Sequence, residues 1–316
     1  MPIDISAPPV FLLTAIAPRK REGSSPTGIV GRHLARQLLD KGASVRILAE
    51  QEQLEGWPQE TQVICGSIAN RGDAATALVG VDRVFLAGAD PASVRDVIGS
   101  AVTEGVDRIV VLSSHGSEYE SAYPPESWFW LAIERAVENS GIAWTHIRPS
   151  AVMGACLEGT YPATGSDWMT SIRLERRVRE PLLDRGYYPF IHEADLAGVA
   201  AIALLNDGYT GQILEAVGLP ISTRSRIDAI AQAIGQEIAM EELSADQARA
   251  AWKQCGWPSG AIEVTLFALE AYASQLKELT EWTLAQKPSV EELIARPMLG
   301  FEQWAYEHAA AYRCKQ

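Results

Sequence analysis

Short apolar runs rich in β-branched residues alternate with segments of helical periodicity through the first half of the chain, and this alternation restricts the fold more than any other feature. The apolar runs predict strands at residues 9–14, 44–48, 62–65, 83–87, 108–113 and 143–147. The segments between them predict helices at residues 31–41, 71–78, 92–104 and 125–139, several of which end at a glycine. Each strand–helix–strand unit is long enough for a right-handed crossover between parallel strands. We therefore expect an α/β fold with a doubly wound parallel sheet.

The regular alternation ends near Pro149. As far as Leu183 the chain is rich in Gly, Trp, Tyr and charged residues, so we expect this stretch to leave the sheet. Helical patterns return at residues 193–205, 222–234, 245–253, 261–284 and 301–312 and predict a smaller, mostly helical lobe. We assign residues 1–155 and 186–217 to the sheet domain, and residues 156–185 and 218–316 to a substrate-binding lobe.

The composition favours a cytoplasmic enzyme that acts on a small molecule. The 316 residues are 47% hydrophobic and 21% charged, which is typical of a chain that folds around a core. The net charge of −13 disfavours nucleic acid or an anionic membrane as the main partner. No secretion signal or membrane-spanning run is evident. The four scattered cysteines form no CxxC pair and predict reduced thiols rather than a metal site, whereas the oligomeric state is left open.

A strand, a glycine-rich turn and a helix follow one another near the N-terminus, and this junction suits a dinucleotide because the helix start presents backbone N–H groups to the diphosphate. The candidate cofactor-binding residues here are Thr14, Gly28, Ile29, Val30 and Gly31.

The turn departs from the usual pattern in two ways. Ala15 stands where a first glycine is expected, and the stretch from Pro18 to Pro26 lengthens the turn. The sequence leaves three interpretations of this stretch open. It is a surface loop beside a working site, it supplies Arg19, Lys20 and Arg21 to cofactor phosphates, or it closes the site.

Glu50 ends the second predicted strand, where an acidic side chain accepts the ribose hydroxyls and repels a 2′-phosphate. This position favours NAD over NADP. The alternative is a solvated glutamate in the run Glu50-Gln51-Glu52. Arg46, within the same strand, is a further candidate for the adenosine end of the cofactor.

Six segments resemble, in order and over nearly the whole chain, the NmrA-like group of atypical short-chain dehydrogenases: TGIVGRHLARQLLDKGASVRIL, GVDRVFLAGAD, GVDRIVVLSS, ERAVENSGIAWTHIRPS, IHEADLAGVAAIALL and FEQWAYEHAAAYR. The resemblance implies a Rossmann domain with a small C-terminal substrate lobe and NAD(P) binding by the turn that contains Gly28 and Gly31. It also implies that Gly88 and Ser113 face the nicotinamide.

Three positions depart from the family pattern. Thr14-Ala15 replaces Thr-Gly, Glu50 replaces an arginine that favours NADP, and Gly66-Ser67 replaces Gly-Asp near the adenine. We expect these changes to weaken NADP binding in particular or dinucleotide binding in general.

The resemblance also implies a reactive centre, because short-chain dehydrogenases reduce carbonyls with a Tyr, a Lys four residues later and a Ser at the end of the fifth strand. Ser113 and Ser114 meet the last requirement, but no Lys occurs between Lys41 and Lys253. Trp130 stands where family members carry a basic residue. We therefore take Ser114, His115 and Tyr123 as the catalytic candidates, with loop capping as the alternative for His115.

Aromatic side chains are dense around the expected cleft and suit a flat, polycyclic or quinone-like ligand. The substrate-binding candidates are Trp128, Trp130, Tyr161, Trp168 and His192. The alternatives are core packing for each aromatic residue and helix capping for His192.

Three functions follow from these features. The first is an NAD(P)-dependent oxidoreductase that acts on an aromatic or quinone-like molecule without a Tyr-Lys pair. The second is a non-redox cyclase, isomerase or dehydratase on the same scaffold. The third is a redox-sensing regulator that binds the cofactor without turnover.

Overall fold

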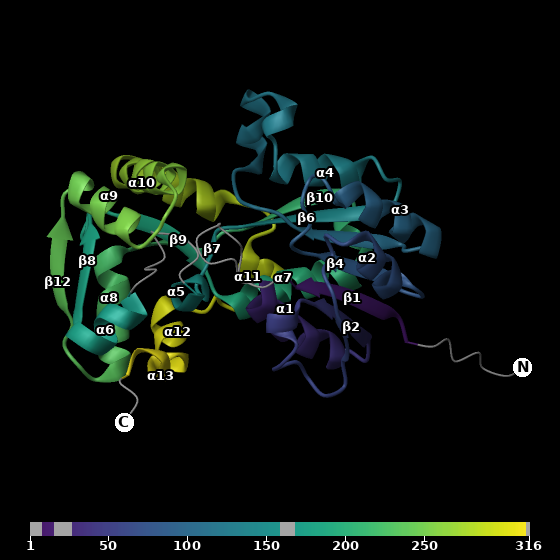
Figure 1. Cartoon of the computed structure of the whole chain (residues 1–316), viewed down its shortest axis with the longest axis horizontal. Coiled ribbons are helices and arrows are strands. Elements are labelled where there is room, and N and C mark those ends of the chain that lie inside the picture. Colours follow the sequence, from purple (N-terminus) through teal and green to yellow (C-terminus); the bar gives the residue numbers. More distant parts are fainter. Residues whose placement is uncertain (1–7, 16–26, 159–167, 314–316) are drawn as a thin grey trace, which may run out of the picture. The chain divides into compact units, whose positions relative to one another are not determined.

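The computed structural model describes residues 8–15, 27–158 and 168–313. Within these ranges the main sheet has seven strands, all parallel, in the order β10-β6-β5-β4-β1-β2-β3 (Figure 1). The strands are β1 (Val10–Ala15), β2 (Ser44–Ala49), β3 (Gln62–Cys65), β4 (Arg83–Leu86), β5 (Arg108–Leu112), β6 (Ala143–Pro149) and β10 (Gln212–Ala216). The predicted doubly wound parallel sheet is confirmed, and its first six strands lie within two residues of their predicted bounds.

Helices cover both faces of this sheet, as the apolar runs require. Side chains from alternate strand positions, such as Leu12, Val84 and Ile109, pack in one buried cluster with residues of three helices. Those helices are α2 (Arg71–Leu78), α3 (Val94–Glu104) and α4 (Trp130–Glu138). The intervening positions, such as Leu13 and Phe85, are equally buried on the other face, where α1 (Thr27–Leu39) packs against β1 and β2. Strands buried on both faces explain why the sequence shows continuous apolar runs.

The seventh strand, β10, was not predicted. It pairs with β6 at the edge of the sheet, and its sequence QILEA has two exposed residues at its start. The chain reaches β10 from α7 (Glu193–Leu205) through the short 3₁₀ turn Asp207–Tyr209. A short, half-exposed edge strand lacks the apolar run that identified the other six.

Apart from α7 and β10, the described residues after Pro149 form eight α-helices and five short strands. Its helices are α5 (Ala155–Glu158), α6 (Trp168–Glu175), α8 (Thr223–Ile234), α9 (Ala245–Gln254), α10 (Ser259–Ala285), α11 (Val290–Ile294), α12 (Phe301–Glu307) and α13 (Ala309–Tyr312). Its strands are β7 (Ala151–Val152), β8 (Arg177–Pro181), β9 (Tyr187–Ile191), β11 (Pro220–Ser222) and β12 (Ala239–Leu243). They form the sheets β11-β9-β7 and β12-β8. The lobe is therefore mostly helical as predicted, with two small sheets that the sequence did not reveal.

The described residues divide into two compact units. The first contains residues 8–15, 27–149 and 196–216, and the second contains residues 150–158, 168–195 and 217–313. Residues 150–155 and 186–195, which we expected in the sheet domain, belong to the second unit because β7 pairs with β9 there. Among the described residues, no helix is both long and apolar enough to cross a membrane.

Candidate functional site

Thr14 ties the end of β1 to the end of β4. Its hydroxyl donates to the carbonyl oxygen of Ala87 at 2.6 Å and accepts the Ala87 amide at 2.8 Å. With an exposure of 1%, the side chain lies inside the sheet, so it sets the spacing of the two strands. The Ala15 side chain and the lengthened turn, including Arg19, Lys20 and Arg21, lie outside the described residues.

Gly28 and Gly31 lie at the start of α1 and face the segment that follows β2. A Cβ atom on Gly28 would lie 1.7 Å from Oε1 of Gln53, and one on Gly31 would lie 3.0 Å from the Trp57 ring. The Trp57 indole donates to the Gln53 carbonyl oxygen at 2.7 Å, and the Arg32 guanidinium lies 5.1 Å from the Trp57 ring centroid. The two glycines therefore allow residues 53–57 to lie directly against α1. We did not anticipate this contact from the sequence.

The start of α1 fits a phosphate group. Its first turn carries no acidic side chain, and backbone N–H groups of a helix start favour an anion. Ile29 and Val30 belong to this turn, as the glycine pattern predicted. Beside Gly28, the Gln53 side chain is only 6% exposed, and its Oε1 atom has no hydrogen-bond partner in the described part of the chain. An unpaired buried amide is costly, and this one lies directly beside the start of α1.

Glu50 follows β2 and is partly buried. The Ser67 hydroxyl donates to Glu50 Oε1 at 2.9 Å, and the Ser67 amide donates to the Asp73 carboxylate at 3.0 Å. A residue that follows β3 therefore orients the acid that we predicted to meet the ribose. This contact also gives a role to Ser67, which stands at one of the departures from the family pattern.

Arg46 requires a correction, because its side chain is engaged within the sheet domain. Its guanidinium donates to Gln62 Oε1 at 2.8 Å and to the carbonyl oxygens of Ala77 and Val79, each at 2.7 Å. These acceptors lie on β3 and at the end of α2. Arg46 thus caps the carboxyl end of α2 and is not part of the cofactor set that we propose below.

Gly88 and Ser113 follow the ends of β4 and β5, where parallel strands present ligand-binding residues. Gly88 has a φ of 78°, a conformation that favours glycine. Ser113 is 3% exposed and donates its hydroxyl proton to Glu134 Oε1 at 2.6 Å. Because a serine hydroxyl has only one proton, Ser113 in this arrangement cannot also donate to a substrate oxygen. The donor role expected of the serine after the fifth strand is therefore not available here.

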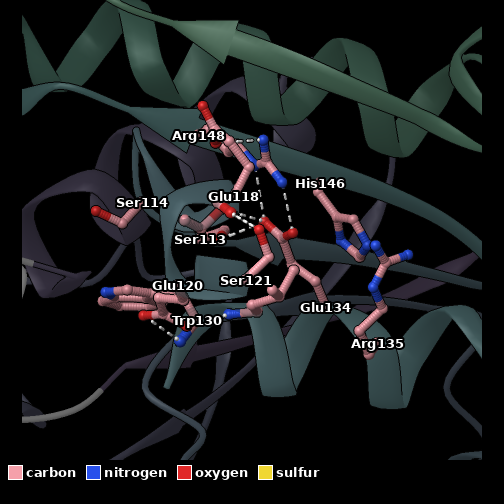
Figure 2. A network of polar contacts seen from close by, with 12 residues as sticks. Ser113, Ser114, Glu118, Glu120, Ser121, Trp130, Glu134, Arg135, His146 and Arg148 are labelled. Carbon is pink, nitrogen blue, oxygen red and sulfur yellow. Dashed lines mark hydrogen bonds and ion pairs between the residues drawn. The ribbon is translucent and has the colours of Figure 1, made fainter. Parts of the chain in front are cut away.

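A buried ion pair joins Glu134 of α4 to Arg148 of β6 (Figure 2). The Arg148 Nε and Nη2 atoms donate to the two carboxylate oxygens of Glu134 at 3.0 and 2.8 Å, and Ser117 donates to the same carboxylate at 3.1 Å. Glu134 is 1% exposed and Arg148 is 6% exposed. Burial alone would raise the pKa of Glu134, but the hydrogen bonds from Arg148 and Ser113 outweigh it and hold this pKa below its ordinary value. The carboxylate therefore stays ionised and keeps the arginine in place.

His146 lies beside this pair on β6 and is completely buried, with its ring stacked on Trp144 at 4.4 Å. Burial lowers the pKa of His146, although Glu134 and Glu138 act in the opposite direction. The folded protein therefore binds a proton at this ring less readily than the unfolded chain does.

The lowered pKa of His146 predicts a pH-dependent stability. Because the unfolded chain takes up this proton first, stability should fall as the pH drops below the ordinary histidine value of 6.5. We expect His146→Phe, which preserves the stacking, to remove up to about 1.4 kcal/mol per pH unit of this slope. Urea unfolding of both proteins at pH values above and below 6.5 measures it, and parallel slopes would contradict the assignment.

His115 is paired with a residue that the sequence did not suggest. Its Nδ1 atom lies 3.0 Å from Oε2 of Glu215, the penultimate residue of β10. The two side chains are 25% and 13% exposed, so a ligand can reach them. Ser114, by contrast, points away from the polar network in Figure 2, and the only described hydrogen bond of its hydroxyl is a long one of 3.4 Å to the His115 carbonyl oxygen.

Tyr123 follows the 3₁₀ turn Ser117–Ala122, and Trp128 follows the 3₁₀ turn Pro125–Ser127. Tyr123 is 66% exposed, and its carbonyl oxygen accepts the Trp128 indole N–H at 2.9 Å. Trp130 begins α4 and meets Phe129 edge to face at 5.0 Å. The Glu120 carboxylate accepts three successive backbone N–H groups at the start of α4 and thereby caps this helix.

Two predicted substrate-binding residues are buried in the second unit. Trp168 is 3% exposed, donates to Glu180 at 2.8 Å and stacks on the Arg226 guanidinium at 4.7 Å. His192 is 1% exposed, and its Nδ1 atom accepts the Ala194 N–H at 3.1 Å. The structure thus shows core packing for Trp168 and helix capping of α7 for His192, which were the alternatives to ligand binding. Tyr161 lies outside the described residues.

The comparisons with known proteins agree with the fold. A family described as NAD(P)H-binding matches residues 26–168. A reductase of Streptomyces griseus, named (4-alkanoyl-5-oxo-2,5-dihydrofuran-3-yl)methyl phosphate reductase, is 32% identical over 290 residues, which cover 90% of this chain and 96% of the reductase. The negative transcriptional regulator NmrA superposes with a TM-score of 0.63 at 13% identity and covers 95% of each chain. The chain belongs to the NmrA-like, NAD(P)-binding family.

The fold of this NmrA-like chain is shared with an enzyme as well as with the regulator. The NADPH-dependent quinone oxidoreductase of Escherichia coli, solved with NADPH, superposes with a TM-score of 0.65 at 17% identity over 94% of this chain and 99% of its own. NAD(P) is thus the cofactor of the family, and the first unit of this NmrA-like chain provides the strand ends and the helix start at which such a cofactor binds.

Proposed function

We propose that this chain is an NAD(P)H-dependent reductase of conjugated, electron-poor acceptors, with an unsaturated lactone as the first choice and quinones as the second. The Streptomyces griseus relative is named for a 5-oxo-2,5-dihydrofuran, which is an unsaturated lactone, and the Escherichia coli neighbour is named for quinones. Both acceptors take a hydride into a conjugated system that spreads the resulting negative charge. Such a reaction needs less help from an acid than the reduction of an isolated carbonyl.

The hydrogen bond from Ser113 to Glu134 carries this proposal. In a carbonyl-reducing site, the serine after the fifth strand donates to the substrate oxygen, and a Tyr-Lys pair supplies the proton. In this chain the Ser113 proton is committed to a buried carboxylate, and the long interval without lysine provides no such pair. A conjugated acceptor removes the need for both groups.

The cofactor, when bound, supplies the hydride. We propose that the backbone of Gly28, Ile29, Val30 and Gly31 holds its phosphates, and that Glu50 accepts the ribose hydroxyls. Gly88 and Ser113 form the floor on the nicotinamide side. His115 is the candidate acid, whereas Ser114 and Tyr123 are weaker candidates because neither is oriented by a second polar side chain among the described residues.

Calorimetric titration with NADH and NADPH is the first test, followed by nicotinamide absorbance during incubation with unsaturated lactones and with quinones. We expect binding, and oxidation of the cofactor with the lactones. Absence of binding at millimolar cofactor would exclude the proposal. Binding without turnover of any acceptor would instead favour a regulator such as NmrA.

Glu50 provides a test of cofactor choice. Its carboxylate is held by Ser67 and would repel a 2′-phosphate, so we expect NADH to bind more tightly than NADPH. Glu50→Arg should reverse this preference, with a change of at least about tenfold in the ratio of dissociation constants, or about 1.4 kcal/mol. The control is Glu52→Arg, which makes the same charge change within the same acidic run. A wild-type preference for NADPH would contradict the role of Glu50.

A second function is favoured by the pairing of His115 with Glu215, because an oriented imidazole also suits proton transfer without redox chemistry. The same scaffold would then move a double bond in an unsaturated lactone. Product analysis by NMR distinguishes the two, since an isomerase forms product without consuming the reduced cofactor.

A further inference from the structure

Glu215 brings a carboxylate to His115 from a distant part of the sequence. His115 follows β5, and Glu215 lies on β10, on the other side of β6. The backbone amide of His115 donates to the Pro149 carbonyl oxygen at 3.0 Å, which fixes the main chain beside β6. The imidazole is then held at Nδ1 by Glu215 at 3.0 Å. Both the backbone and the ring of His115 are therefore restrained within the first unit.

Of the two described cationic or ionisable groups near the Glu215 carboxylate, Arg148 binds other carboxylates more closely, and His115 is the nearer partner. Arg148 faces three carboxylates, but it is bound closely to Glu134, at 2.8 Å, and to Glu118, at 2.7 Å. Its distance to Glu215 is longer, at 3.7 Å. Among the described charged groups that face Glu215, His115 is therefore the nearer partner, and a positive charge on its ring is compensated.

We infer that Glu215 is the positioning residue that holds the proton of neutral His115 on Nδ1, so that Nε2 of the protonated ring serves as the proton donor of the proposed reduction. A carboxylate that accepts from Nδ1 fixes the tautomer and orientation of the ring. The neutral form left after proton transfer is the same tautomer that Glu215 stabilises. The inference rests on the proposed function for the identity of the reaction, but not for the pairing itself.

The proton and electron balance of the step is complete. The reduced nicotinamide cofactor of the proposed function would supply the hydride, so that its C–H bond breaks as a C–H bond forms at the β-carbon of the unsaturated lactone. The electrons of the lactone double bond move toward the carbonyl. A C–H bond then forms at the α-carbon as the Nε2–H bond of His115 breaks. The ring keeps its second proton on Nδ1, hydrogen-bonded to Glu215, and water restores the proton on Nε2.

The pairing is tested without any cofactor or substrate. Nitrogen-15 NMR of the histidine rings reports which nitrogen carries the proton, and His115→Asn assigns the signal among the five histidines. We expect the Nδ1–H tautomer in the wild type, its loss in Glu215→Met, and its retention in Glu118→Met. The last variant is the matched control, because Glu118 shares Arg148 with Glu215 but makes no described contact with His115. A wild-type ring protonated on Nε2 alone would overturn the inference.

The catalytic part is tested by reduction of an unsaturated lactone in deuterated water. We expect deuterium on one face of the α-carbon, and a fall in kcat of about 10- to 100-fold in Glu215→Met, by analogy with other groups that orient a reactive side chain. The KM for the lactone and the dissociation constant of the cofactor should change little, and Glu118→Met should keep the wild-type kcat. Unchanged kcat in both Glu215→Met and His115→Asn would refute the donor role. Absence of turnover in the wild type would refute the proposed function, while the NMR measurement still decides on the pair.

Discussion

Arg148→Met is expected to lower the free energy of unfolding by about 3–5 kcal/mol, because it leaves the buried Glu134 carboxylate without its cation. Two Arg148 nitrogens bond to this carboxylate, which is 1% exposed. Only the hydroxyls of Ser113 and Ser117 would remain as described partners. Urea unfolding at neutral pH, followed by circular dichroism, measures the loss.

An ion pair on α4, the helix that carries Glu134, serves as the control, because its arginine is exposed. Arg135 lies 2.6 Å from Glu138, but its side chain is 59% exposed, so Arg135→Met should cost less than about 1 kcal/mol. The double variant Glu134→Leu/Arg148→Met removes both buried charges and should recover most of the lost stability. Equal losses of unfolding free energy in Arg135→Met and Arg148→Met would show that the buried pair contributes no more to stability than the pair on α4.

Gly28→Ala is expected to impair both folding and cofactor binding. Its methyl group would lie 1.7 Å from Gln53 Oε1, so the buried glutamine side chain must move, at a cost of about 1–3 kcal/mol. In the phosphate site that we propose, the methyl group would also stand close to the backbone that approaches the cofactor phosphates. We expect the affinity for reduced cofactor to fall by about tenfold or more. Urea unfolding and calorimetric titration measure the two effects separately.

Two further variants separate the effects of Gly28→Ala. Combining it with Gln53→Ala removes the clash and should restore stability relative to Gln53→Ala alone, while cofactor binding stays weak. Gly99→Ala is the control in α3, where a Cβ atom meets nothing within 4 Å. It should stabilise the helix by about 0.5–1 kcal/mol and leave binding unchanged. If Gly28→Ala behaves in the same way, the start of α1 is not the phosphate site.

The sheet was predictable because burial on both faces leaves a strong signal in a single stretch of sequence. Residues 62–65 and 71–78 were predicted with the bounds that the structure shows for β3 and α2. The strands of the second unit were missed because they are short, and several carry exposed charged residues, as in β8 and β12. Their pairing depends on contacts between distant segments, which local periodicity does not report.

The site was predictable only where its chemistry is local. The glycine pattern predicted the start of α1, which the structure shows. The family resemblance directed attention to the residues after the fifth strand, where Ser113 and His115 are candidates. The partners of these residues were not evident, because nothing in the sequence distinguishes Glu134 and Glu215 from other glutamates. Only the structure shows that Glu134 is buried against Ser113 and that Glu215 lies 3.0 Å from His115. Arg46 was predicted from its position on the second strand to contact the cofactor. In the structure its guanidinium instead caps the carboxyl end of α2.

The position of β10 in the chain has a consequence for protein synthesis. Six of the seven described strands of the main sheet have been synthesised once the ribosome passes Pro149, whereas β10 follows only after residues 150–195 of the second unit and α7. Until then β6 is an open edge with unpaired backbone groups, which can recruit other chains. A ribosome stalled before Gln212 would therefore carry a sheet that is both prone to aggregation and without the carboxylate that holds His115.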